Sequence, residues 1–436
     1  MNPSPRVTGR LPLSCALGLL VLIHATNYVD RMALGLLLQE IKVDLVLSDT
    51  QLGLLTGLAF AVFYALMGVP IARWADRGDR VKIISLTASV WCGMVALCGA
   101  ATSFVQLLLI RVGVGVGESG CVPPAHSLIA DYFERSRRAR AMAIYGLGGP
   151  LGMTIGYFVG GWLNELYGWR LTFVFLGLPG LALALVAWFA LAEPRRNTSF
   201  EVGTVARSSE VAPDLAATIA TLWRNATFRN LMVAYTVSSF FGVGIQQWKP
   251  AFFVRTYGLE TGEVGAWFAL IYGSCGLAGA YLGGELASRF AARNERLQLS
   301  AIALCYSVFA VFSFATYLAP TPTLAFIAMG LGTLGLYGIA GPYFAVMQSL
   351  VPERMRATAI AVLYLAGNLV GMGLGPLGAG MISDALHATT GDMSLRWALV
   401  VLCPGYFWCA WHVWRASRTV TTELGEVERA AVHEGS

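Results

Sequence analysis

The stretches that decide the fold are ERSRRARAMAI at residues 134–144 and ERMRATAIAV at residues 353–362, which lie half a chain apart. Each is a basic loop that leads directly into an apolar segment. A second pair of loops, ARWADR at residues 72–77 and GELASR at residues 284–289, shows the same relation earlier in each half. One basic loop can resemble another by composition alone, but both matches fall at corresponding places. The sequence therefore predicts an internal duplication.

The composition around these loops is that of a membrane protein. Of 436 residues, 56% are apolar and 13% are charged, and the mean hydropathy is +0.63; soluble domains carry roughly 25% charged residues. This excludes water-soluble enzymes, nucleic-acid binders and secreted disulfide scaffolds. The eight cysteines all fall in apolar segments without a C-x-x-C pair, so neither a disulfide framework nor a metal site is indicated. The basic N-terminus leads into an apolar stretch without a small-residue cleavage site, which predicts a first span, not a removable signal.

A window of about 19 residues predicts an all-α polytopic protein with twelve transmembrane helices in two pseudo-symmetric six-helix bundles. The first bundle covers residues 1–192, a polar cytoplasmic linker covers 193–228, the second bundle covers 229–414, and a cytoplasmic tail covers 415–436. Two parallel repeats predict a substrate site at their interface near the bilayer midplane. The expected spans are 13–37, 50–72, 83–102, 105–130, 140–163, 171–192, 229–254, 263–287, 298–318, 322–349, 357–383 and 396–414.

Lysine and arginine are segregated between the two sides of the membrane. The loops assigned inside carry Arg73, Arg77, Arg80, Lys82, Arg135, Arg137, Arg138, Arg140, Arg289, Arg293, Arg296, Arg354 and Arg356. The opposite face is assigned only Lys42, Arg170, Lys249, Arg255 and Arg396. By the positive-inside rule, we expect a multi-pass protein of the cell (inner) membrane with both termini in the cytoplasm.

Four charges interrupt the apolar pattern inside the membrane. Asp30 and Arg31, with Asn27 one turn earlier, lie in the first span, and Arg111 and Glu118 lie in the fourth. Each charge at the middle of a helix costs about 2.5–3.5 kcal/mol on insertion scales. Together they would cost about 10 kcal/mol, which is comparable to the stability of a whole domain. These side chains must therefore face the protein interior.

The helical period predicts how these charges pair. Arg111 and Glu118 are two turns apart on one face, about 10 Å along the axis, so we do not expect them to pair with each other. Asp30 and Arg111 lie at similar depths because their spans run in opposite directions, which leaves Arg31 for Glu118 or for an anionic substrate. We expect Asp30 and Glu118 to bind and release protons, with Arg31, Arg111 and Asn27 binding substrate or assisting the coupling. The alternative is a static ion-pair network that fixes helix packing.

Weaker candidates are polar side chains elsewhere in the spans. His24 and His126 are either proton relays or interior histidines whose hydrogen bonds are satisfied. The others either line the cavity or form hydrogen bonds between helices; they are Tyr64, Tyr145, Gln348, Tyr364 and Asn368.

The loop after the second span resembles the G-x-x-x-D-R-x-G-R-[KR] signature of the major facilitator superfamily. It reads ARWADRGDRVK at residues 72–82, with Ala72 in place of the first glycine and the second glycine displaced to Gly78. The resemblance implies the family's fold and a cytoplasmic gate formed by Asp76, Arg77 and Arg80. Ser288 stands where the second half would carry the equivalent carboxylate, so no matching gate is expected there.

The chain more specifically resembles the spinster branch of that superfamily. The resemblance lies in NYVDR at residues 27–31, SDTQLGLL at 48–55, and Arg111 through Glu118 followed by Pro123, Pro124, Ile129, Ala130 and Asp131. It implies a proton-linked transporter of lysophospholipids or sphingoid lipids. The R-x-x-x-G-x-G-E element is also shared with organic-anion symporters, so the alternative substrate is a small organic anion such as a sugar acid.

The expected ligands follow from this interpretation. We expect no cofactor besides protons as the coupling ion, an amphiphilic substrate, contact with membrane lipids, no nucleic acid, and a monomer. The spans contain no H-E-x-x-H or G-x-S-x-G, so neither an enzyme nor catalytic residues are expected. A receptor would usually carry an added soluble domain, which the short loops do not provide.

Overall fold

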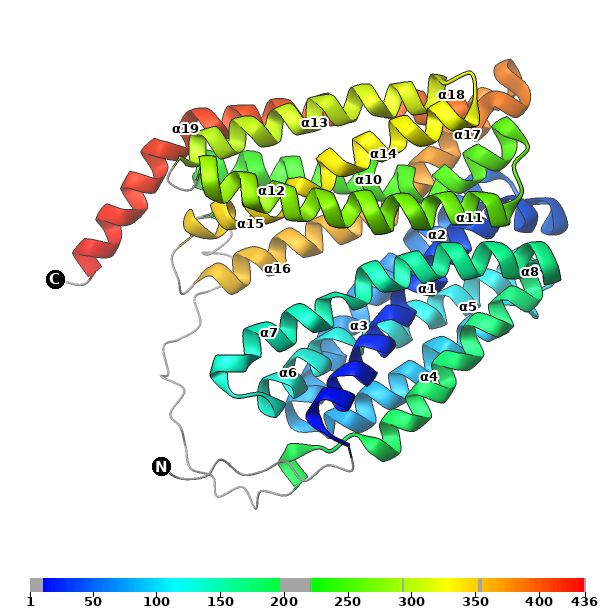
Figure 1. Ribbon diagram of the computed structural model, residues 1–436, viewed down its shortest axis with the longest axis horizontal. Coiled ribbons are helices and arrows are strands. Elements are labelled where there is room, and N and C mark those ends of the chain that lie inside the picture. The colour runs from blue at the N-terminus through cyan, green and yellow to red at the C-terminus, as the bar shows by residue number, and fades with distance from the viewer. Residues whose placement is uncertain (1–10, 197–219, 221, 292–293, 352–354, 435–436) are drawn as a thin grey trace. The chain divides into compact units, whose positions relative to one another are not determined.

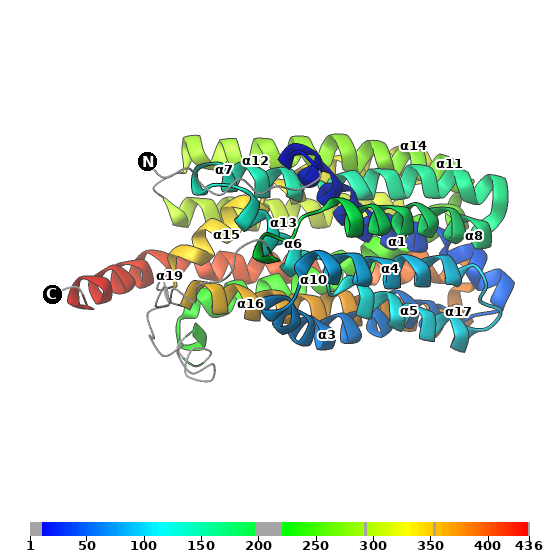
Figure 2. The same cartoon turned by 90° about the horizontal axis from the view of Figure 1, so that it is seen from below.

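The computed structural model describes residues 11–196, 220, 222–291, 294–351 and 355–434. The described residues are almost entirely helical and include no strand. They form two compact units: the described residues up to 196 together with 259–269 make unit 1, and those from 220 to 258 and from 270 to 434 make unit 2. Most of the expected linker, 197–219, and part of the 353–362 repeat lie outside the described residues. Figures 1 and 2 show that the long helices of each unit run side by side along a common direction.

Unit 1 is a bundle in which α1 and α4 both pack on the long helix α8. Its helices are α1 (Leu13–Leu45), α2 (Asp49–Thr56), α3 (Leu58–Arg77), α4 (Arg80–Cys98), α5 (Phe104–Glu118), α6 (Val122–Tyr132), α7 (Arg135–Gly146) and α8 (Gly148–Ala190), followed by the 3₁₀ turn η1 (Pro194–Arg196). The unit also includes nearly all of α11 (Thr261–Leu270), although the chain reaches that helix through unit 2.

Unit 2 is built around α10 and α13, which both pack on α19. Its helices are α10 (Ala226–Tyr257), α12 (Leu277–Phe290), α13 (Glu295–Leu318), α14 (Pro322–Gly338), α15 (Ala340–Ser349), α16 (Arg356–Ala366), α17 (Gly375–Thr390), α18 (Ser394–Leu402) and α19 (Gly405–Glu434). Two π-helical segments, η2 (Ile271–Gly276) and η4 (Gly367–Leu374), and the 3₁₀ turn η5 (Gly391–Met393) complete it. The expected tail 415–436 continues α19 to Glu434.

All twelve expected spans fall on helices, but consecutive helices are merged in places. By length and apolarity, nine continuous helical stretches of the described chain could cross a membrane. Two of these stretches, 135–190 and 358–425, each contain two expected spans, and α10 carries the seventh span without being one of the nine. Gly168 divides the first stretch: its φ of 75° breaks the helix between the fifth and sixth spans. Only glycine adopts that conformation without strain.

Local sequence explains where several of these helices begin. Ser48 and Gln51 form a capping box at α2: the Ser48 hydroxyl accepts from the Gln51 N–H at 3.1 Å, and the Gln51 side chain accepts from the Ser48 N–H at 2.9 Å. Asp79 caps α4 by accepting from the Lys82 N–H at 2.9 Å. Such caps satisfy amide groups that the first turn leaves without partners. The 48–55 and 72–82 motifs therefore also set helix boundaries.

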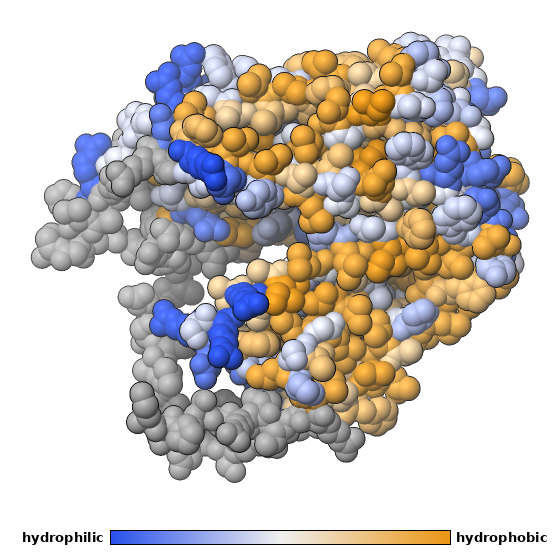
Figure 3. Space-filling model, in the orientation of Figure 1, coloured by the Kyte–Doolittle hydropathy of each residue, from blue (hydrophilic) through white to orange (hydrophobic). Residues whose placement is uncertain are grey.

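The surface of the helices is apolar over most of their length. Large hydrophobic side chains such as Leu109, Phe189 and Tyr281 are more than half exposed. On the face in Figure 3, apolar side chains cover the middle of the helices and hydrophilic ones gather toward the helix ends. A surface of this kind is stable in hydrocarbon and not in water. The chain is therefore a multi-pass membrane protein.

Small residues bring α8 against α1 at the level of the intramembrane charges. A methyl group on Gly152 would overlap the carbonyl oxygen of Ala25, and one on Gly156 would lie 2.8 Å from the carbonyl oxygen of Val29. The two backbones can approach closely only because these side chains are absent. This packing holds the part of α1 that carries Asp30.

Candidate functional site

The functional residues of unit 1 form a buried charge cluster contributed by α1 and α5. The Arg111 Nη1 lies 3.4 Å from Oδ2 of Asp30. The Arg31 guanidinium binds Oε2 of Glu118 with two nitrogens, of which Nε is at 3.0 Å. The first pairing is the one expected from depth, and the second is one of the two alternatives left open for Arg31. We call these four residues the charge quartet.

The quartet is almost completely shielded from solvent. Asp30 is 3% exposed, Arg111 1% and Glu118 0%, whereas the Arg31 side chain retains 17% exposure. Several of its polar atoms have no hydrogen-bond partner among the described residues: Oδ1 of Asp30, Oε1 of Glu118 and Nε of Arg111, together with Nδ2 of neighbouring Asn27. Buried polar groups are nearly always paired in folded proteins. The cluster therefore retains places for a proton, a water or a substrate group.

Aromatic rings of α3 enclose the two guanidinium groups. The Phe60 ring centroid lies 4.5 Å from the guanidinium carbon of Arg31 and 5.5 Å from that of Arg111. Tyr64 lies 5.6 Å from Arg31 and stacks on Phe60. Gly115 of α5 permits this approach, because a methyl group there would lie 2.8 Å from the Phe60 carbonyl oxygen. Phe60 was not identified from the sequence, where its apolar side chain was indistinguishable from lipid-facing phenylalanines.

Three of the weaker candidates form one stacked group beside the quartet. The His24 ring stacks on Tyr145 with centroids 4.4 Å apart, and His126 packs edge-on against the same ring at 5.3 Å. Nδ1 of His24 lies 3.1 Å from the Tyr145 carbonyl oxygen. The tyrosine ring separates the two histidines. Their part in proton transfer stays a prediction.

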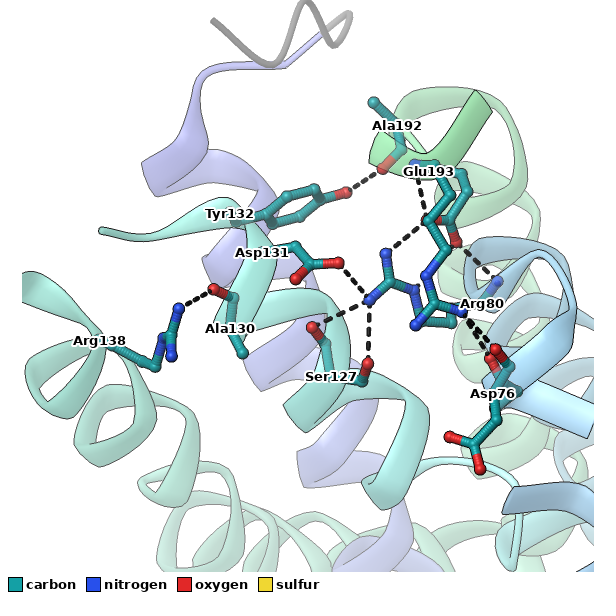
Figure 4. A network of polar contacts seen from close by, with 11 residues as sticks. Asp76, Arg80, Ser127, Ala130, Asp131, Tyr132, Arg138, Ala192 and Glu193 are labelled. Carbon is teal, nitrogen blue, oxygen red and sulfur yellow. Dashed lines mark hydrogen bonds and ion pairs between the residues drawn. The ribbon is translucent and has the colours of Figure 1, made fainter. Parts of the chain in front are cut away.

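A second polar network of unit 1 lies at the start of α4, around Arg80 (Figure 4). Arg80 is fully buried; its Nη2 lies 2.5 Å from Oε1 of Glu193, and its Nη1 lies 2.6 Å from Oδ2 of Asp131. Nη1 also donates to the Ser127 carbonyl oxygen at 3.0 Å. Burial would raise the pKa of the Glu193 carboxyl, but the hydrogen bonds and charge of Arg80 outweigh it, and this pKa lies below its ordinary value. Glu193 was read from the sequence as the beginning of the linker.

The predicted gate residues differ in their surroundings. Arg80, which the sequence places in an exposed basic loop, is instead bound inside unit 1 because Glu193 folds back over it. Asp76 and Arg77 have exposed side chains. The Asp76 backbone carbonyl accepts from Arg195 Nη1 at 3.0 Å (Figure 4). A gating role for Asp76, Arg77 and Arg80 stays a prediction.

Unit 2 contains a cavity of about 290 Å³ with one buried cation, Lys249. The sequence counts Lys249 among the charges of the outer face, but the structure places it within α10, where it is only 9% exposed. The signal for it was a single charge inside the expected span 229–254. Gln348, Tyr364 and Asn368 belong to helices of unit 2 but do not line this cavity. Tyr364 contacts Tyr235 and Phe344, which do.

Comparison with known proteins agrees with this architecture. The Major Facilitator Superfamily pattern matches residues 20–376. An MFS-type efflux pump of Mycolicibacterium smegmatis is 33% identical over 89% of this chain and 88% of its own length, and the hexuronate transporter of Bacillus subtilis is 26% identical over 88% and 90%.

Among solved structures, the chain matches a bacterial homolog of the human lysosomal transporter spinster, crystallised inward-facing and unoccupied. The TM-score is 0.81 at 32% identity, over 94% of this chain and 98% of that one. The family and fold are those of transporters, not of enzymes. The chain belongs to the major facilitator superfamily, as a spinster-like transporter.

Proposed function

We propose that this protein is a proton-coupled secondary active transporter that works by alternating access. The observation that carries the proposal is the charge quartet: two carboxyl groups buried beside two guanidinium groups, with unpaired oxygens on both carboxyls. Ionisable groups inside a membrane are functional by default, because their burial is costly. Asp30 is the leading proton site and Glu118 the second.

The quartet is electrically balanced when both carboxyl groups are ionised. A substrate anion that drew Arg31 away would leave Glu118 buried without its counter-charge, and such a carboxylate is stable only after it binds a proton. The Arg31 side chain is partly exposed and can move to a substrate anion, whereas Glu118 is fully buried. The 3.4 Å separation of Arg111 from Asp30 is longer than an ordinary charge-assisted hydrogen bond. Asp30 is thus the carboxyl group that is bound less tightly by its guanidinium partner.

The preferred substrate class is an amphiphilic lipid such as a lysophospholipid or a sphingoid lipid. The likeness to the spinster homolog supports it. The alternative is proton symport of small organic anions such as sugar acids, which the hexuronate transporter of Bacillus subtilis and the partly exposed guanidinium of Arg31 support. The distribution of lysine and arginine supports insertion in the cell (inner) membrane with both termini cytoplasmic.

The test is proton flux into proteoliposomes that contain the purified protein. A lysophospholipid and a small sugar acid are supplied in parallel to wild type and Asp30→Asn. A lysophospholipid-dependent proton flux that Asp30→Asn abolishes supports both the coupling and the lipid. A proton flux evoked only by the sugar acid is consistent with the proton mechanism and overturns the proposed lipid substrate. Undiminished proton-driven transport by a folded Asp30→Asn variant would refute the proton site.

A further inference from the structure

The cavity in unit 2 is lined by side chains of two kinds. Tyrosine and phenylalanine supply eight of the eighteen lining residues, and the hydroxyl groups of Ser238, Ser239 and Thr333 lie among them. The rings come from distant parts of the unit: Tyr235 from α10, Tyr272 from η2, Phe309 from α13, Tyr343 from α15 and Tyr406 from α19. Aromatic walls with a few placed polar groups are typical of sites for organic ligands.

Lys249 is the cation of this cavity, and its charge is only weakly compensated. Its Nζ lies 3.4 Å from the Tyr272 hydroxyl and 5.9 Å from the ring centroids of Tyr272 and Phe309. Within the described part of the chain, no carboxylate forms an ion pair with it. By contrast, the buried charges of the quartet and Arg80, all in unit 1, each have an oppositely charged partner.

Among the described side chains, the Lys249 ammonium group lacks a counter-charge and most of its hydrogen-bond acceptors. The Lys249 ammonium offers three donors, and one long contact to a hydroxyl uses at most one of them. The faces of aromatic rings attract a cation but accept no strong hydrogen bond. Charges inside a membrane-spanning helix are kept where they pair with another charge or meet a pathway. An anion in the cavity would satisfy the ammonium, and no described side chain does.

We propose that Lys249 and the tyrosine-lined cavity bind the acidic group, a carboxylate or a phosphate, of the transported molecule. The proposal rests on the proposed transport function and adds the residue that selects an anionic substrate. The ammonium provides the charge-assisted hydrogen bonds, and the surrounding rings contact the apolar or hydroxylated part next to the acidic group.

The local structure suits this role. Tyr272 lies in the π-helical segment η2, and such irregular turns frequently occur at functional sites because they redirect side chains. On α10, the Trp248 indole donates to the Pro376 carbonyl oxygen at 2.9 Å and so anchors the helix beside Lys249. Ligand pockets usually measure about 300–1,000 Å³. The cavity, at about 290 Å³, therefore suits a headgroup or a small acid more than a whole lipid.

The experiment is equilibrium binding to the purified full-length protein in detergent, without a proton gradient. The probes are lysophosphatidic acid and the monoacylglycerol of the same chain, which differ by the phosphate. Wild type should prefer the phosphate-bearing probe by at least about tenfold, the size of one charge-assisted hydrogen bond. Lys249→Met should abolish this preference and leave monoacylglycerol binding unchanged, whereas Lys249→Arg should retain most of it.

The controls distinguish the role of Lys249 from a general effect of removing a lysine and from the proposed proton coupling. Lys82→Met removes an exposed lysine of unit 1 and should keep the preference. The assay uses no proton gradient, so a failure of proton coupling does not affect this test. Glucuronate and inorganic phosphate serve as competitors: displacement of the lipid by either shows that the free acid is recognised, and no displacement shows that the lipid headgroup is. Equal binding of the two lipid probes by wild type, or an unchanged preference in Lys249→Met or in Lys249→Gln, would overturn the proposal.

Discussion

The Asp30–Arg111 pair could stabilise the fold, couple transport to protons, or do both. Removing the two charges singly and together separates these roles. Asp30→Asn leaves Arg111 buried without its counter-charge, and Arg111→Gln does the same to Asp30. The double variant removes both charges and restores the balance. We expect each single variant to be strongly destabilised and the double variant to be destabilised by no more than either single one.

The magnitude follows from the geometry. At 3.4 Å, two unit charges attract by about 5 kcal/mol when the effective dielectric constant is about 20. Part of this attraction only offsets the loss of hydration, so the pair itself adds little net stability. Removing one partner, however, strands the other and costs about 3–5 kcal/mol. The expected coupling energy of the double-mutant cycle is therefore several kcal/mol, well above the few tenths found for independent sites.

The assay is thermal unfolding in one detergent, followed by tryptophan fluorescence, with proton flux measured in parallel. The matched control is the pair Arg170 and Asp44, whose side chains are 40% and 42% exposed. Its coupling energy should be only about 0–1 kcal/mol, because water competes for both charges. Both single variants should lose proton coupling. Asp30→Asn removes the proton-binding group, and in Arg111→Gln the Asp30 carboxyl group, left without its counter-charge, stays protonated.

Two results would refute this reasoning. Additive destabilisation in the double variant would show that the two charges do not interact. Normal proton-driven transport by the double variant would show that the pair only holds the helices together, as in the static network. Stability regained without proton coupling is the expected outcome.

Three further predictions concern packing and the helix ends. Glu193→Gln should destabilise the protein at neutral pH because Arg80 loses its counter-charge. The pKa of Glu193 lies below its ordinary value of 4.5, so the stability that the ionised carboxylate contributes is present above pH 4.5 and is lost as the pH falls further. The unfolding midpoints of wild type and variant should therefore converge in acid, and a constant difference between them would contradict this. Glu423 accepts from two backbone N–H groups at the start of α10, at 2.7 and 2.8 Å, so its change to alanine should cost about 1–2 kcal/mol in thermal unfolding, and an unchanged midpoint would show that water replaces it. Gly152→Ala should cost about 1–3 kcal/mol and reduce transport by separating α8 from α1, whereas Gly146→Ala, with open space beside it, should have little effect; equal effects would rule out the packing argument.

The pairing of Asp30 with Arg111 was predictable because depth and helical period are local properties, whereas the partner of Arg31 stayed open between Glu118 and a substrate. Asp30 and Arg111 lie at similar depths in antiparallel spans, and the two-turn spacing of Arg111 and Glu118 puts them on one face. The partner of Arg80 was not predictable. Glu193 lies 113 positions away and stands in a polar stretch that begins like any linker. Only the return of the chain after α8 brings its carboxylate to the buried guanidinium.

Lys249 shows the limit of counting charges along the chain. The positive-inside rule treats a lysine near the end of a span as part of the adjoining loop, because it uses position and not direction. The rotation of α10 about its own axis decides whether that side chain meets water, lipid or the interior. That rotation depends on the packing of α10 against α19, η4 and α17, which no local pattern encodes.

The sequence by itself determined that this chain is an all-helical membrane protein with four interior charges. Hydropathy is summed over neighbouring residues, and the cost of a charge in hydrocarbon does not depend on its partner. The tertiary structure alone decided that Phe60 packs against both guanidinium groups, that Glu193 binds Arg80 and that Lys249 lines a cavity rich in aromatic rings. These contacts join residues far apart in the chain, and they exist only once the helices have packed at particular rotations.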